Sequence, residues 1–149
     1  MHIVLVEPEI PQNTGNIARL CVLTETTLHL VGRLGFSISN YYLRRAGLDY
    51  WDCLSVKYHK ALADLMLSPQ ERLIFVSTKA TRLYTEIRYL PDDYLVFGSE
   101  SWGLPRELIE ANPEASIRIP MWGPKPRSLN LSNAAAIVLY EGLRQTRGF

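Results

Sequence analysis

The sequence predicts an α/β fold in which a mostly parallel sheet carries helices on both faces. Short runs of apolar residues recur along the chain, as is typical of strands that are buried on both faces. Segments with the apolar spacing of helices separate many of these runs, and an alternation of strands with helices favours a parallel sheet.

Six apolar runs are the predicted strands. Glycine or proline closes three of them: Pro8 follows the first run, Gly32 the second and Pro120 the last. A proline ends a strand because it has no N–H to donate to a neighbouring strand. In chain order, the predicted strands are residues 2–6, 28–31, 54–58, 72–77, 94–98 and 116–119.

Helices are expected between the strands and at the end of the chain. Asn13 and Asn16 have side chains that cap helices, so the first helix is expected to start there and to run through residues 17–23. Pro105 suits the first turn of a helix that ends near residue 111. The last helix is expected from Asn130 to about residue 146. Shorter helical patterns occupy residues 41–46 and 60–67.

Composition and charge limit the class of protein. A chain of 149 residues is expected to form a single domain, residues 1–149, and can bury its own core. The net charge is +1, so an anionic partner must be met by a local patch of cations. No apolar run approaches the roughly 20 residues that span a membrane. With no secretory leader before the first strand, we expect a cytoplasmic protein whose Cys21 and Cys53 stay reduced.

Common nucleotide and metal motifs are missing from the sequence. It contains neither GxGxxG nor the GxxxxGK[ST] phosphate loop, and no HExxH. His2, His29 and His59 are scattered along the chain, so no metal site is expected. Ligands of parallel sheets bind beyond the carboxyl ends of the strands. Three loops stand out there, at residues 7–19, 98–105 and 121–133.

Three motifs lie in these loops: P-x-N-T-G-N-I-A-R at residues 11–19, F-G-S-E-S-W-G-L-P at 97–105 and I-P-M…R-S-L-N-L-S-N-A at 119–134. Together they resemble the three motifs of the SPOUT family of RNA methyltransferases. The chain length and R-R-A-G-L-D-Y at residues 44–50 narrow the resemblance to the small tRNA (cytidine/uridine) 2'-O-methyltransferases, which modify the wobble nucleotide of certain leucine tRNAs. The resemblance covers essentially the whole chain.

The resemblance implies a fold and a reaction. The last segment would thread through a loop to make a deep C-terminal trefoil knot, and the protein would be a homodimer that forms its acceptor site between subunits. The methyl donor would be S-adenosylmethionine, without a metal. The substrate would be the wobble nucleotide of a tRNA, of the cytidine or carboxymethylaminomethyluridine type. Alternatives are the same chemistry at another RNA site, a non-catalytic RNA-binding knot protein, and an unrelated nucleotide-binding protein without affinity for S-adenosylmethionine.

The resemblance also implies which residues hold the methyl donor. Backbone hydrogen bonds and apolar walls would hold it, which suits a neutral adenine ring. Without the motifs, most of the positions implied to bind the cofactor would be interpreted as ordinary strand-end and core residues. The implied cofactor positions are Val76, Gly98, Ile119, Met121, Ser128 and Leu129.

Catalysis has to activate a ribose 2'-hydroxyl, which is a poor nucleophile at neutral pH. The family uses the arginine of its first motif, here Arg19. Because arginine stays protonated, we interpret Arg19 as a positioning and charge-stabilising group that acts beside an RNA phosphate, although it could instead pair with Glu25. Glu100 would orient Arg19 or an asparagine of the facing subunit. The implied catalytic residues are Arg19, Asn16, Glu100, Ser132, Asn133 and Tyr140.

Some of these residues have simpler interpretations. Asn13 and Asn16 precede Arg19 and could equally be plain helix caps, and Tyr140 could be a buried tyrosine that satisfies one hydrogen bond. Trp102 stands where some relatives carry an arginine; it could stack on a base or pack at a subunit interface. Further candidates for RNA contacts are Arg44, Arg45, Lys57, Lys60, Lys79, Arg82, Lys125, Arg127, Tyr41, Tyr42, Trp51 and Trp122.

Overall fold

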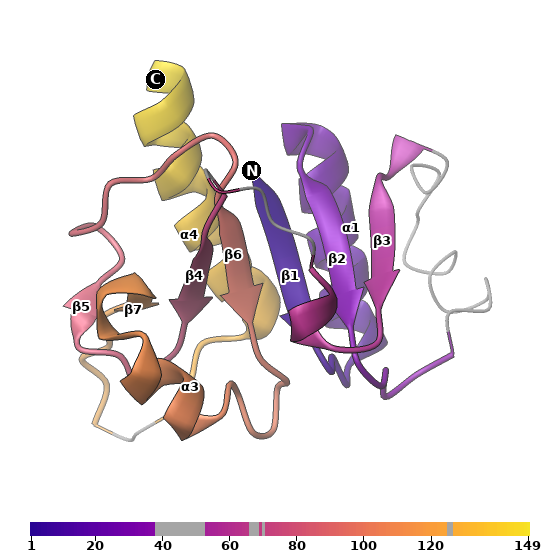
Figure 1. Cartoon of the computed structure of the whole chain (residues 1–149), viewed down its shortest axis with the longest axis horizontal. Helices are drawn as coiled ribbons and strands as arrows, with labels where there is room; N and C mark the ends of the chain where they lie inside the picture. Colours follow the sequence, from indigo (N-terminus) through magenta and orange to yellow (C-terminus); the bar gives the residue numbers. More distant parts are fainter. Residues whose placement is uncertain (38–52, 66–68, 70, 125–126) are drawn as a thin grey trace.

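In the part of the chain that the structure describes, seven parallel strands form one sheet that has helices on both faces (Figure 1), which confirms the predicted fold class. The computed structural model describes residues 1–37, 53–65, 69, 71–124 and 127–149. The strand order is β3-β2-β1-β6-β4-β7-β5, and every pairing between strands is parallel. The elements are β1 (His2–Val6), α1 (Pro11–Thr24), β2 (Thr27–Val31), β3 (Val56–His59), η2 (Leu62–Asp64), β4 (Leu73–Val76), β5 (Arg82–Leu83), β6 (Tyr94–Phe97), α3 (Arg106–Ala111), η3 (Pro113–Ala115), β7 (Ser116–Arg118), α4 (Leu131–Leu143) and the π-helical η4 (Arg144–Gly148).

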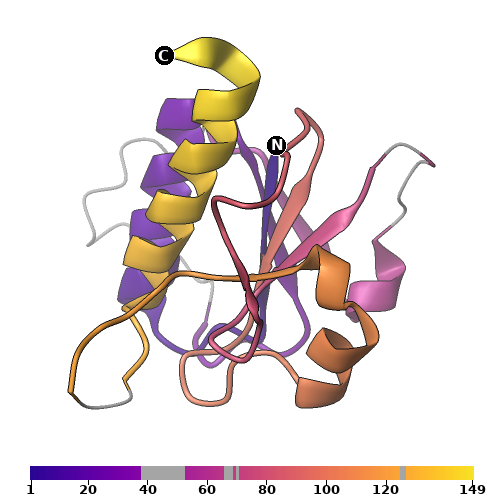
Figure 2. The same ribbon diagram turned by 90° about the vertical axis from the view of Figure 1, so that its left-hand side faces the viewer.

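Alternating side chains of the strands divide the core into two layers. On β1, Ile3 and Leu5 are buried with residues of α1 and α4, whereas Val4 is buried with Ile109 of α3. Helices α1 and α4 lie side by side on the same face of the sheet, and α3 lies on the other face (Figure 2). All four residues of β6 are buried because this strand is at the centre of the sheet.

The start of α1 differs from the sequence expectation. The helix begins at Pro11, so Asn13 and Asn16 lie inside it, and the prediction that they cap its start is wrong. Proline has no N–H to satisfy, which suits the first turn. The two residues just before the helix are held by a distant loop, since the Glu100 carboxylate accepts from the N–H groups of Glu9 and Ile10. The negative charge of this carboxylate, next to the N-terminus of α1, also interacts favourably with the positive end of the helix dipole.

Three other elements depart from the predicted pattern. Among the described residues of the range 60–67, only the single 3-10 turn η2 is helical. Strand β5 was not predicted, because two residues are too few to carry an apolar period, and it forms by pairing with β7. The last helix starts after Asn130 as predicted, but its α-helical part ends at Leu143 and η4 continues the coil. The helix predicted at residues 41–46 lies outside the described residues.

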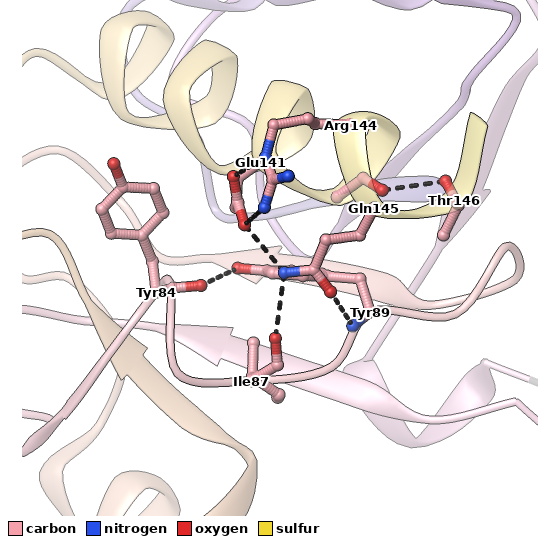
Figure 3. A network of polar contacts seen from close by, with 8 residues as sticks. Tyr84, Ile87, Tyr89, Glu141, Arg144, Gln145 and Thr146 are labelled. Atoms are coloured by element: carbon pink, nitrogen blue, oxygen red, sulfur yellow. Dashed lines mark hydrogen bonds and ion pairs between the residues drawn. The ribbon is translucent and has the colours of Figure 1, made fainter. Parts of the chain in front are cut away.

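A polar network fixes η4, which continues α4, to the segment between β5 and β6 (Figure 3). Gln145 donates from Nε2 to the carbonyl of Ile87 at 3.2 Å, and its Oε1 accepts from the N–H of Tyr89 at 3.0 Å. Arg144 donates to both carboxylate oxygens of Glu141 at 2.9 Å, which lowers the pKa of Glu141. The bonds of Gln145 thus hold together two segments that are more than 50 residues apart in sequence.

Two further expectations concern topology and membranes. Strand β7 lies between β4 and β5, and the chain then runs to α4 on the α1 face (Figure 2). This order agrees with the implied trefoil knot, whose threading stays a prediction. In the part of the chain that the structure describes, no helix has both the length and the apolarity needed to cross a bilayer.

Candidate active site

A cavity of about 400 Å³ lies at the carboxyl ends of β4, β6 and β7. Parts of all three motif loops line it, together with residues that follow β4. The edge of the sheet thus gathers segments that are far apart in sequence, as expected for a parallel α/β fold. All six implied cofactor positions are among its lining residues: Val76, Gly98, Ile119, Met121, Ser128 and Leu129.

Gly98 lets the loop after β6 fold back onto the strand end. A Cβ atom at this position would lie 2.1 Å from the carbonyl carbon of Gly103 and 2.3 Å from the nitrogen of Leu104, which no side chain can do. The fold-back is closed by the N–H of Gly103, which donates to the carbonyl of Ser99 at 2.9 Å, and Gly103 itself has a φ of 66°. Both glycines are therefore required by the shape of this wall.

A chain of side-chain hydrogen bonds joins the three motifs beside the cavity. Asn13, only 5% exposed, donates from Nδ2 to Glu100 Oε1 at 3.0 Å and accepts at Oδ1 from Asn130 Nδ2 at 2.9 Å. Asn130 Oδ1 then caps α4 by accepting from the N–H of Ser132 at 2.9 Å and from its hydroxyl at 2.6 Å. The starts of α1 and α4 and the loop after β6 are thus fixed to one another.

The chain matches a known family along almost its full length. Residues 1–140 match the SpoU rRNA Methylase family. The chain belongs to this family. It is 47% identical over 147 residues to the tRNA (cytidine(34)-2'-O)-methyltransferase of Escherichia coli, and the match covers 97% of this chain and 93% of that protein. The resemblance seen in the three motifs is confirmed.

Solved structures of similar proteins have the same fold as this SpoU methylase. One, from a study of the 2-OH methylation of C/U34 on tRNA, has a TM-score of 0.91 and 42% identity, covering 99% of this chain and 97% of that one. Another is an AdoMet-bound rRNA methyltransferase from Sinorhizobium meliloti, with a TM-score of 0.83 and 25% identity, covering 96% of this chain and 55% of that one.

The implied catalytic residues of the SpoU methylase fall into two groups. Glu100 lines the cavity, and it holds Asn13 of its own chain. Ser132 lies at the start of α4, where its hydroxyl supports the Asn130 cap. The other four are exposed and are not among the lining residues: Asn16 and Arg19 on α1, and Asn133 and Tyr140 on α4.

The exposed pairs lie on one face of each helix. Asn16 and Arg19 are three residues apart on α1, and Asn133 and Tyr140 are seven apart on α4, as their spacing predicted. Tyr140 is 47% exposed, so its interpretation as a buried tyrosine is wrong. Its ring meets that of Phe149 edge-on, with centroids 6.3 Å apart.

Sequence reasoning missed the roles of Asn13 and Asn130. Both line the cavity, and both use their amide groups to connect other motifs. Asn130 was predicted only as the start of the last helix, and Asn13 was interpreted either as a helix cap or as a polar group that precedes Arg19. Asn13 is bonded to Glu100 and Asn130, which are 87 and 117 residues away in sequence, and no local sequence pattern can predict such a pairing. Asparagine in each of two motifs was the only available signal.

The three histidines are scattered in sequence but adjacent in space. His29 on β2 is hydrogen-bonded to His2 on β1, with ring nitrogens 3.1 Å apart, and to His59 on β3 at 2.9 Å. Burial lowers the pKa of His29 to about 3, and the two neighbouring imidazoles add to this effect. Among the described residues, no three His, Cys, Asp or Glu side chains are placed to hold a metal ion.

The predicted RNA contacts are only partly described. Lys79 lines the cavity and donates from Nζ to the carbonyl of Leu104 at 3.0 Å, and Arg127 is exposed next to Ser128. Arg82 binds the carbonyl of Glu114 at 2.9 Å. The candidates that lie outside the described residues are Arg44, Arg45, Tyr41, Tyr42, Trp51 and Lys125.

Proposed function

We propose that this chain is an S-adenosylmethionine-dependent 2'-O-methyltransferase that acts on the wobble nucleotide of tRNA, with leucine tRNAs as its substrates. The observation that carries this proposal is the cavity that all six implied cofactor positions line. The near full-length similarity to the enzyme from Escherichia coli supports the choice of tRNA and of nucleotide 34. The nucleotide would be a cytidine or a carboxymethylaminomethyluridine.

The cavity suits the cofactor in size and chemistry. Its volume of about 400 Å³ lies in the range of small-ligand sites. Apolar groups such as Phe97 and Leu104 alternate in its lining with the hydroxyl groups of Ser77 and Ser99, which suits an adenosyl group that has a flat ring and polar ribose edges. S-adenosylmethionine supplies the methyl group. The residues that would hold it are the six cofactor positions named above.

The chain's own residues would position the acceptor. Arg19 stays protonated, so its part is to hold an RNA phosphate and to stabilise negative charge as the ribose 2'-oxygen loses its proton. The bonds among Glu100, Asn13 and Asn130 fix the first turns of α1 and α4. These helices carry the exposed groups Asn16, Arg19, Asn133 and Tyr140.

A homodimer is part of this proposal. Large exposed apolar groups lie on α1 and just after η4, with Leu23 70% exposed and Phe149 74% exposed. A second copy would cover them by the self-complementary contact of a two-fold dimer and would bring Arg19 and Tyr140 to the partner's cavity. We further propose a single domain whose chain is knotted between β7 and α4, acting in the cytoplasm.

Transfer of labelled methyl from S-adenosylmethionine to bulk tRNA, followed by nuclease mapping, tests the reaction. We expect label in a 2'-O-methylated wobble nucleotide. Label elsewhere in the RNA would preserve the chemistry and overturn the substrate. Absence of both label and cofactor binding would overturn the whole proposal. Arg19→Ala should abolish transfer while S-adenosylmethionine still binds, because Arg19 is not part of the cavity lining.

Sedimentation of the purified protein tests the dimer. Leu23→Asp should shift the equilibrium toward monomers, because it places a charge in the proposed contact. Tyr58→Ser is the matched control, since Tyr58 is also an exposed apolar side chain but lies on β3 at the edge of the sheet. Equal dimer dissociation constants for the two variants would contradict this contact.

A further inference from the structure

Trp102 is an exposed indole on the wall of the cavity. Its side chain is 83% exposed, in the loop between β6 and α3 (Figure 1), and it is among the lining residues. A large apolar side chain left in water gains nothing for the fold of one chain. Its place beside the proposed cofactor site therefore suggests a function in binding.

The backbone that carries this indole is held in place from two sides. The N–H of Ser101 donates to Glu9 Oε2 at 2.8 Å, while Glu100 Oε2 accepts from the N–H of Glu9 at 2.8 Å. These two bonds form a reciprocal clamp between the loop after β6 and the loop after β1. The N–H of Trp102 also donates to Ser99 Oγ at 3.3 Å. Because its backbone is already ordered, the indole can bind a partner without a large loss of conformational entropy.

We propose that Trp102 is a stacking platform for an unpaired base of the RNA acceptor, either the target nucleotide or its immediate neighbour. This inference rests on the proposed function. Methyl transfer to a 2'-oxygen brings one ribose to the cavity, and the base attached to that ribose must then lie at its rim. An exposed indole there offers a flat face to any base, whatever its hydrogen-bonding edge.

Cations near Trp102 fit the phosphates of such an RNA strand. Lys79 lines the cavity and is bound to the same loop through the carbonyl of Leu104. A second hollow adjoins the first at Lys79 and is lined by Arg106, which lies 4.0 Å from Glu110. Arg127 is exposed next to Ser128, another lining residue. Aromatic faces combined with cations are the usual composition of single-strand RNA sites.

Kinetics of Trp102→Ala and Trp102→Phe test the platform. The alanine variant should raise the KM for tRNA by roughly 5- to 150-fold, the loss expected for one base–aromatic stack. The kcat at saturating tRNA should change less than twofold, which separates a loss of RNA binding from a loss of chemistry. Trp102→Phe should restore most of the affinity, because a phenyl ring still stacks. Tyr58→Ala on β3 is the control and should leave the KM unchanged.

Direct binding separates this inference from the proposed function. An RNA hairpin with a seven-nucleotide loop should quench the indole fluorescence of the wild type, and Trp102→Phe should lose that part of the quenching. Should the wild type fail to methylate tRNA, the proposed function falls, yet the fluorescence still decides whether a base stacks on Trp102. Unchanged hairpin affinity in Trp102→Ala would overturn the inference. A weaker dimer with unchanged hairpin affinity would assign the indole to the subunit contact instead.

Discussion

Replacing Gly98 by alanine should both destabilise the protein and weaken cofactor binding. The added Cβ would lie 2.1 Å from the carbonyl carbon of Gly103, whereas ordinary contacts begin near 3.4 Å. The atoms in its way are backbone atoms, which cannot rotate aside as a flexible side chain can. The chain at residues 103–104 must therefore move by at least about 1 Å.

The size of the effect follows from the contacts that this movement breaks. Overpacking costs about 1–3 kcal/mol. The hydrogen bond from the N–H of Gly103 to the carbonyl of Ser99 would be lost or stretched, at about 1 kcal/mol. We expect a loss of about 3 kcal/mol in the free energy of unfolding, or roughly 6–12 °C in Tm for a chain of this length.

Cofactor affinity should fall with stability, because residues 97–104 form one wall of the cavity. Calorimetry should show the Kd for S-adenosylmethionine rising at least about tenfold, which corresponds to the loss of about 1.4 kcal/mol of contacts. Gly123→Ala is the matched control, since nothing lies within 4 Å of its added Cβ. If Gly98→Ala matched the control in both Tm and Kd, the assignment of this close approach to the cofactor wall would be refuted.

Four further substitutions, at Asn130, Gln145 and His29, test one residue of the cavity and two interactions elsewhere in the fold. Asn130→Ala should lower the free energy of unfolding, measured by urea denaturation, by about 1–2 kcal/mol, because it removes the cap of α4 and the donor to Asn13 Oδ1. Asn130→Asp should keep the cap and lose only the bond to Asn13. Gln145→Ala should cost about 1–3 kcal/mol by chemical denaturation, because it frees the backbone of residues 87–89 from α4. His29 should make the protein sensitive to acid. Below about pH 6.5 His29 is protonated in the unfolded chain, whereas in the folded chain its pKa is about 3 and it stays neutral. The free energy of unfolding should therefore fall by about 2 kcal/mol between pH 7 and pH 5. His29→Gln should flatten that pH dependence, and an equally steep slope in the variant would assign the proton uptake to other groups.

Strands at the centre of the sheet could be predicted from sequence because their environment is uniform. Residues 3–5 and 94–97 are buried, and each group lies within a continuous apolar run that identifies the strand. Strand β5 has two residues and owes its conformation to β7 alongside it, and a local pattern cannot express that. The start of α1 was misplaced for a similar reason, because the N–H groups of Glu9 and Ile10 just before it donate to the carboxylate of Glu100, about 90 residues away in sequence.

The site was predictable in so far as it depends on motifs. Gly98 and Ile119 have no reactive or charged group that would single them out, and only the motif context marked them as candidate cofactor positions; both line the cavity. The motifs did not predict which of their side chains would be hydrogen-bonded to one another. Asn13 lies between Glu100 and Asn130 only because β1, β6 and α4 converge at one edge of the sheet, which is a property of the topology.

The hydrogen bonds of Glu100 bear on the unidentified proton acceptor of the proposed reaction. Its two oxygens already accept from the N–H groups of Glu9 and Ile10 and from the amide of Asn13. Protonation of Glu100 would weaken these three bonds, because a neutral carboxyl group is a poorer acceptor than a carboxylate. We therefore propose that Glu100 is a positioning group and that the proton leaves by way of another acceptor, for which an RNA phosphate held by Arg19 is our candidate.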